Sequence, residues 1–172
     1  MKNEIVNKVA KSGLVNIDLS DYAPKEEITG IDIKQFLFEG VLLKEKAFRK
    51  NLQAFDFQKY QNRIVGVYCS ADAVIPMWAY MLVVTCLNPW CTKIFFGNKE
   101  QALQQSILER INNIDVQKFK NKKVIVNGCS NIQLSEKAYI AIVKKLQNNV
   151  QSLMFGEACS AVPIYKKEIN KS

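Results

Sequence analysis

The sequence predicts an α/β protein whose sheet is mostly parallel. Two observations support this prediction: a segment that occurs twice along the chain, and the order of short β-branched runs and longer helical patterns within each copy. The chain has 172 residues, 48% of them apolar, which suits one domain with a sizeable core. We therefore expect a single domain over residues 1–172, built around the repeat.

The repeat aligns residues 56–98 with residues 115–157 without a gap, and 12 of the 43 aligned positions are identical. The identities begin with Asp56 over Asp115 and continue to Gly97 over Gly156. Such self-similarity indicates an internal duplication, and we use it as the first guide to the predicted architecture.

Each copy predicts a strand, a helix and a second strand. Pro76 suits the first turn of its helix because proline has no N–H to leave unpaired there, and Ser135 can cap the helix of the second copy. A strand–helix–strand unit implies parallel strands joined by a right-handed crossover. The expected elements are strands at 64–68, 94–97, 124–127 and 153–156, and helices at 76–87 and 135–146.

Two such units related by a pseudo-twofold axis give the sheet order 2-1-3-4. The first strand of each copy then lies beside the other at the centre of the sheet. Their carboxyl ends form a topological switch point, which is where open α/β sheets bind ligands.

The N-terminal third differs from the repeat. Residues 14–19 and 28–33 predict two strands, and Ile5 and Val9 indicate a short helix before them. We expect residues 1–55 to form a small antiparallel α+β appendage. An amphipathic helix at 99–112 joins the two copies. An equivalent helix precedes the first copy, since the alignment extends backward to place Phe48, Leu52 and Phe55 over Ile107, Ile111 and Ile114.

Composition excludes several classes of function. The chain has no histidine, so there is no Ser–His or Cys–His catalytic pair and no His-ligated metal. The net charge of +8 comes almost entirely from scattered lysines, which favours a solvated surface over a nucleic-acid interface. No run is long enough to span a membrane, and the N-terminus lacks a signal peptide's apolar core, so we expect a cytoplasmic protein in a reducing compartment.

Three of the five cysteines follow predicted strands. Cys69 and Cys129 come after the first strand of each copy, and Cys159 comes just beyond the last strand. Because parallel strands end at one edge, we expect the three thiols to gather there. Thiolates in this arrangement favour zinc or an iron–sulfur cluster, with Asp72 or Glu157 completing or supporting the ligand set.

The same cysteines leave two alternatives open. Cys69 leads into a helix N-terminus, which lowers the pKa of a thiol, so it could act as the nucleophile of a thiol enzyme or as a sulfur carrier. The three cysteines could equally be ordinary buried residues. Cys86 and Cys91 belong to the packing of the apolar helix. The residues leave open whether the chain is an enzyme.

A further hypothesis is a non-catalytic protein-interaction module. The predicted helix at 76–87 is apolar nearly all round, so it must be covered on two faces, by the appendage or by another subunit. The second alternative corresponds to a homodimer through that helix. Binding of an acidic partner to the basic surface is also open.

Four stretches together resemble a known family: residues 4–9, 36–40, 68–81 and 156–165, of which the two cysteine-bearing stretches are the most specific. The chain resembles an uncharacterised bacterial family that is typical of Bacteroidetes and is classified as a domain of unknown function. Genes of this family often stand beside the SUF genes for iron–sulfur cluster assembly. The resemblance implies an accessory role in that assembly, with iron–sulfur assembly proteins as partners, and no established activity.

Overall fold

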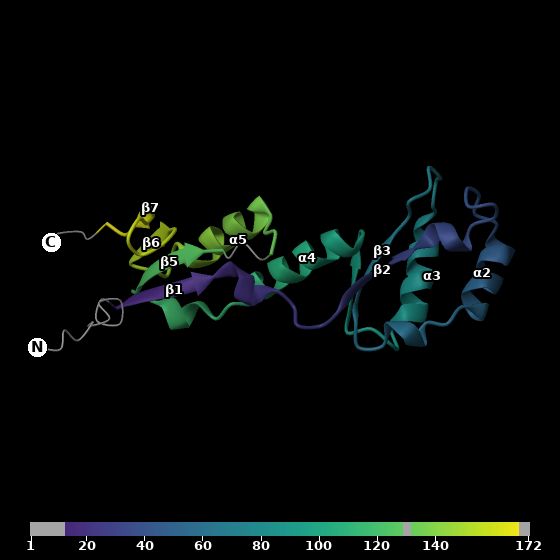
Figure 1. Cartoon of the computed structure of the whole chain (residues 1–172), viewed down its shortest axis with the longest axis horizontal. Coiled ribbons are helices and arrows are strands. Elements are labelled where there is room, and N and C mark those ends of the chain that lie inside the picture. The colour runs from purple at the N-terminus through teal and green to yellow at the C-terminus, as the bar shows by residue number, and fades with distance from the viewer. Residues whose placement is uncertain (1–12, 129–131, 169–172) are drawn as a thin grey trace, which may run out of the picture. The chain divides into compact units, whose positions relative to one another are not determined.

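The structure is a computed structural model that describes residues 13–128 and 132–168 (Figure 1). It is a mixed α/β protein with mostly parallel strands, which confirms the predicted fold class. The chain divides into two compact units. Unit 1 comprises residues up to Ala23 and from Ile107 onward, and unit 2 comprises Pro24–Ser106. The single domain over 1–172 stays a prediction, and each unit is described separately below.

Helices and strands alternate along most of the chain. In unit 2 and across its boundary the elements are β2 (Ile28–Asp32), η2 (Ile33–Phe36), α2 (Glu45–Ala54), η3 (Gln58–Tyr60), β3 (Ile64–Tyr68), α3 (Met77–Leu87), β4 (Lys93–Phe96) and α4 (Lys99–Asn112). The elements of unit 1 are β1 (Leu14–Asp18), η1 (Leu19–Tyr22), η4 (Val116–Phe119), β5 (Lys123–Asn127), α5 (Glu136–Leu146), β6 (Ser152–Phe155) and β7 (Val162–Lys166).

Unit 2 is built on a three-stranded parallel sheet in the order β2-β3-β4. β3 lies in the centre and is buried along nearly its whole length, because β-branched side chains fit a strand that is covered on both faces. α2 and α3 belong to the same core, in which Phe48 of α2 is fully buried and contacts the aromatic rings of Phe36 and Trp78.

Unit 1 is built on a four-stranded sheet in the order β1-β5-β6-β7. β1, β5 and β6 are parallel, and β7 is antiparallel to β6 with an irregular register between Leu153 and Met154. β7 contains Pro163, which is tolerated because an edge strand does not need every backbone N–H for pairing.

The strand order corrects two predictions. The strands form two sheets, so the single sheet of order 2-1-3-4 is wrong: β3 and β5 do not pair with each other. The N-terminal strands explain why, since β2 occupies the second edge of β3 and β1 occupies the second edge of β5. The expected antiparallel appendage over residues 1–55 is likewise not formed, because β1 and β2 each pair in parallel within a sheet.

Corresponding elements of the two units keep the register of the sequence repeat. β3 and β5, α3 and α5, and β4 and β6 all begin and end at aligned residues. The details agree as well. Asn62 and Asn121 both have positive φ, at 60° and 57°, and their amides donate to the backbone oxygens of Trp90 and Asn149 at 2.9 and 2.8 Å. Each unit therefore folds its strand–helix–strand segment with the same turns.

One position of the repeat differs for a steric reason. Gly66 in β3 corresponds to Ile125 in β5, which is buried. A Cβ atom on Gly66 would lie 2.7 Å from the backbone oxygen of Asn98, and closer still to that of Gly97. Only glycine allows the start of α4 to approach β3 so closely.

Candidate functional site

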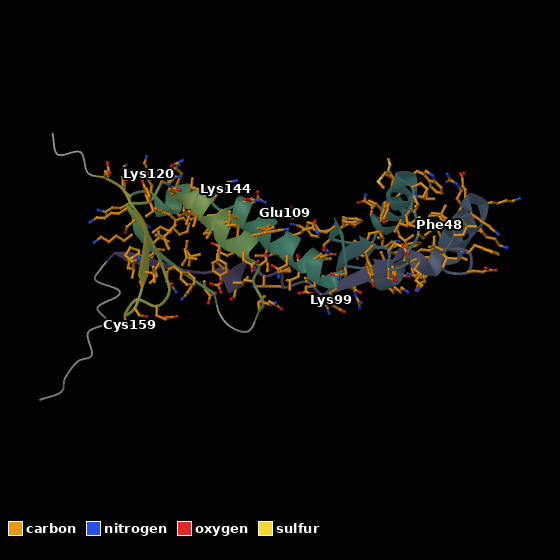
Figure 2. The ribbon with its side chains drawn as sticks, turned by 90° about the horizontal axis from the view of Figure 1, so that it is seen from above. Phe48, Lys99, Glu109, Lys120, Lys144 and Cys159 are labelled. Atoms are coloured by element: carbon orange, nitrogen blue, oxygen red, sulfur yellow. The ribbon has the colours of Figure 1, made fainter. Side chains whose placement is uncertain are left out.

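The cysteines predicted to form a cluster lie in different parts of the chain. Cys69 follows β3 in unit 2 and is half-buried. Cys159 follows β6 in unit 1 and is exposed (Figure 2). Cys129 lies outside the described residues. The inference that one sheet edge brings the three thiols together is wrong, because β3 and β5 belong to different sheets.

The other two predicted ligands lie in loops of different units. Asp72 and Glu157 are both exposed, Asp72 in the loop before α3 and Glu157 in the loop after β6. Within residues 13–128 and 132–168, no group of three or more His, Cys, Asp or Glu side chains could hold a metal ion. A zinc or iron–sulfur site using Cys129 stays a prediction.

The loop after β3 is tied to the neighbouring strand by a serine. Ser70 donates to the carboxylate of Asp32 twice, from its amide at 3.0 Å and from its Oγ at 2.5 Å. The amide of Lys34 also donates to Asp32. Partial burial raises the pKa of Asp32, but the hydrogen bonds from Ser70 and Lys34 outweigh it and hold the pKa below its usual value. The arrangement fixes the loop that carries Cys69.

Cys86 and Cys91 pack against the core of unit 2. Burial raises the pKa of Cys91 to about 11 and also raises the pKa of Cys86. A thiol with a raised pKa is a poor nucleophile near neutral pH, because little thiolate is present. Both residues therefore act as apolar packing groups.

The most distinctive surface of unit 2 is the outer face of α3. Its inner face buries Ala79, Val83 and Leu87 against the core. Its outer face carries Met77 and Met81, which are 73% and 69% exposed. We call the row Met77, Met81 and Val84 the α3 stripe.

A further aromatic residue extends the apolar surface beside the stripe. Phe96, at the end of β4, is exposed and contacts Tyr80 of α3 edge-to-face, with ring centroids 5.7 Å apart. Large apolar side chains that gather on an exposed surface mark an interaction site more often than isolated ones do.

The equivalent helix of unit 1 shows which features of α3 the fold requires. α5 buries Ala138, Ile142 and Leu146, at the same three positions as the inner face of α3. Its remaining surface differs, because α5 carries four charged residues where α3 carries none: Glu136, Lys137, Lys144 and Lys145 stand in place of Met77, Trp78, Thr85 and Cys86. Packing against the core therefore requires the apolar inner face of both helices. It does not require the rest of the α3 surface to be uncharged.

The sequence predicted an apolar helix but did not single out the α3 stripe. The signal was present in the repeat, since comparing the two helices position by position separates core residues from surface residues. Met77 then stands out, because the charged Glu136 occupies the equivalent position, whereas Met81 is matched by the apolar Ile140.

Comparison with known proteins identifies one family. A family model described as protein of unknown function (DUF2480) matches residues 3–167, and the chain belongs to this family. No curated protein matches the chain, and no solved structure does. Among the residues that the structure describes, no helix is both long and apolar enough to cross a membrane.

Proposed function

We propose that this member of the DUF2480 family is a non-catalytic protein-interaction module that forms a homodimer through the α3 stripe. The observation that supports the proposal is the exposure of Met77 and Met81 on a helix without a single charged residue. In α5, Glu136 stands in place of Met77, so the fold itself does not need an apolar side chain at that position of the stripe, while Ile140 and Val143 are apolar at the other two.

The side of α3 that faces the core is covered within unit 2. Trp78 contacts Phe48 of α2, with ring centroids 5.9 Å apart, and Ala79, Val83 and Leu87 are fully buried. The exposed residues of α3 are Met77, Met81, Val84 and Thr85, and they lie on one side of the helix. A row of this shape fits a partner helix.

Spacing favours a second copy of the same helix as the partner. The stripe residues follow one another at intervals of four and three positions, which places them along one side of a helix. Two helices with this pattern can pair along a shared seam, as in coiled coils and helix bundles. Methionine suits such a seam because its unbranched side chain adapts to fill gaps.

Charge also favours self-association at this face. The chain carries a net charge of +8, so most surfaces of two copies repel each other. Pairing through α3 brings no charge of that helix against its counterpart. Burying one methionine side chain is worth about 1.5–3 kcal/mol, and a two-fold axis buries each stripe residue twice.

The test compares two substitutions at matched positions of the repeat. Met81→Lys places a charge in the stripe, while Ile140→Lys places the same charge at the equivalent position of α5, where the side chain is 60% exposed. Sedimentation velocity at about 1–100 µM protein should show a dimer for the wild type and for Ile140→Lys. Met81→Lys should be monomeric, with the dissociation constant raised by roughly 100-fold, because two unpaired charges would be buried per dimer.

Circular dichroism of both variants provides the folding control. A wild-type chain that stays monomeric throughout this concentration range would reject the homodimer. If the Met81→Lys variant still forms a dimer, the stripe is not the interface. If the Ile140→Lys variant is monomeric, the interface lies on α5 instead.

The accessory role in iron–sulfur assembly is a second proposal, about the partner rather than the surface. It is supported by the resemblance to a family whose genes stand beside the SUF genes, and by Cys69 and Cys159 in loops that follow strands. Metal binding by Cys69, Cys129 and Cys159 belongs to the same proposal. It requires ligands that the described residues of one chain do not bring together.

A further inference from the structure

α5 carries a second surface of different chemistry, and we infer that it binds an acidic segment of a partner protein. A hollow of about 400 Å³ lies between α5 and the C-terminal end of α4, within unit 1. Its lining consists of Asn112, Lys137, Ile140, Ala141, Lys144 and Lys145. We call this the α5 groove. It is independent of the α3 stripe.

The α5 groove is strongly positive. Three of its six lining residues are lysines, and none is acidic. Within the described ranges, neither Lys137 nor Lys144 forms an ion pair. Lys145 differs, because its Nζ donates to the backbone oxygen of Asn112 at the end of α4. Lys145 is thus fixed at one side of the groove, while the other two ammonium groups are available to a ligand.

The groove also offers an apolar contact between its charges. Ile140 is exposed, and it lies three positions after Lys137 and four positions before Lys144, on the same side of the helix. Ala141 is small and leaves room beside it. A ligand that matches this pattern carries carboxylates on either side of an apolar side chain, which is the pattern of an acidic peptide.

A nucleic acid fits the groove less well than a peptide does. The lining has no arginine to grip phosphates with two parallel hydrogen bonds, and no aromatic side chain on which a base could stack. An exposed isoleucine contributes little to binding a phosphate backbone. The chemistry therefore favours carboxylates presented by protein.

The repeat supports a specific role for these lysines. Lys137, Lys144 and Lys145 occupy the positions of Trp78, Thr85 and Cys86 in α3. The basic character is therefore not a property of the shared fold. The two equivalent helices present one uncharged surface and one basic surface.

The experiment uses the full chain and a fluorescent peptide in which one leucine is flanked on each side by glutamates. Binding is measured by fluorescence anisotropy at low salt, where surface charges are screened least. The double variant Lys137→Glu/Lys144→Glu should weaken binding by roughly tenfold or more, and Ile140→Ser should weaken it about threefold to tenfold. The control is Lys46→Glu/Lys50→Glu on α2, which changes the net charge by the same amount and should leave the affinity within about twofold.

Two results would overturn the inference. Equal weakening by both double variants would mean that the peptide responds only to net charge. Tighter binding of a short single-stranded DNA than of the peptide, lost in the same variant, would make the groove a nucleic-acid surface instead. If the glutamate variant of α5 does not fold by circular dichroism, Lys137→Gln/Lys144→Gln replaces it, with an expected loss of about threefold or more.

Discussion

Replacing Gly66 by alanine should destabilise unit 2 severely, although it adds only one methyl group. The new Cβ would lie 2.7 Å from the backbone oxygen of Asn98 and nearer still to that of Gly97. Ordinary contacts of a Cβ begin at about 3.4 Å, so the backbone has to move by roughly 0.7 Å or more.

The groups that would have to move are held in place. The amide of Gly97 donates to the backbone oxygen of Val67, and the backbone oxygen of Asn98 accepts from the amide of Ala102 in the first turn of α4. The amide of Asn98 is also held, because it donates to Oε1 of Gln101. Moving this segment therefore breaks the start of a helix as well as a sheet contact.

The expected net loss is about 2–4 kcal/mol. Overpacking a buried site costs about 1–3 kcal/mol, and each broken backbone hydrogen bond adds about 1 kcal/mol. Alanine also gives the unfolded chain fewer conformations than glycine does, and this offsets about 0.4–1 kcal/mol of the loss. Gly30→Ala is the matched control, because its Cβ would meet the side chain of Tyr68 at 3.0 Å, which can shift, and its nearest backbone atom, Lys99 N, lies 3.6 Å away.

Urea denaturation followed by tryptophan fluorescence measures this directly, because both tryptophans, Trp78 and Trp90, lie in unit 2. With a slope of about 1–2 kcal/mol per M, Gly66→Ala should lower the midpoint by roughly 1–4 M. Gly30→Ala should lower it by less than about 1 M. Equal midpoints for the two variants would refute the argument that the close approach of Gly97 and Asn98 is what requires glycine at position 66.

Two further predictions concern titratable groups. Because burial raises the pKa of Cys91 to about 11, only about one Cys91 thiol in a thousand is ionised at pH 8. Peptide mass spectrometry should therefore show that iodoacetamide labels Cys91 roughly tenfold or more slowly than the exposed Cys159. Equal labelling rates would contradict the burial of Cys91. The pKa of Asp32 is lowered in the folded state, so its contribution to stability is present above the unfolded value of about 3.9 and is lost as the pH falls through the folded pKa. Ser70→Ala should therefore lower the free energy of unfolding, measured in urea, by about 1 kcal/mol at neutral pH and by much less once Asp32 is protonated. A loss that does not change with pH would show that Ser70 does not act through the Asp32 carboxylate.

The sequence predicted the elements well because local patterns determine them. The helix expected at 99–112 is α4 with the same bounds, and those expected at 76–87 and 135–146 are α3 and α5, each beginning one position later. The strand expected at 64–68 is β3. β7 was not predicted, since Pro163 interrupts its pattern and only an edge position permits a proline there.

Strand pairing was predicted less well, for a physical reason. A strand buried on both faces has the same apolar pattern whichever strand lies beside it, so β3 and β5 give no signal that separates a common sheet from two sheets. The wrong pairing then placed Cys69 and Cys129 at one edge. The α3 stripe depends on one helix alone, and for that reason its apolar character was visible in the sequence.

The pairing of β1 with β5 has a consequence for synthesis of the chain. Leu14 pairs with Lys123, across more than half of the sequence, whereas Ile28 in unit 2 pairs with Ile64, which follows much sooner. At a ribosomal rate of about 5–20 residues per second, β1 is made roughly 5–20 seconds before its partner strand exists. During that interval the whole of unit 2 is synthesised, so the nascent chain carries an unpaired strand ahead of a segment whose own strands can already pair. The order of strands thus means that β1 stays unpaired until β5 is synthesised, after β2, β3 and β4 are able to pair with one another.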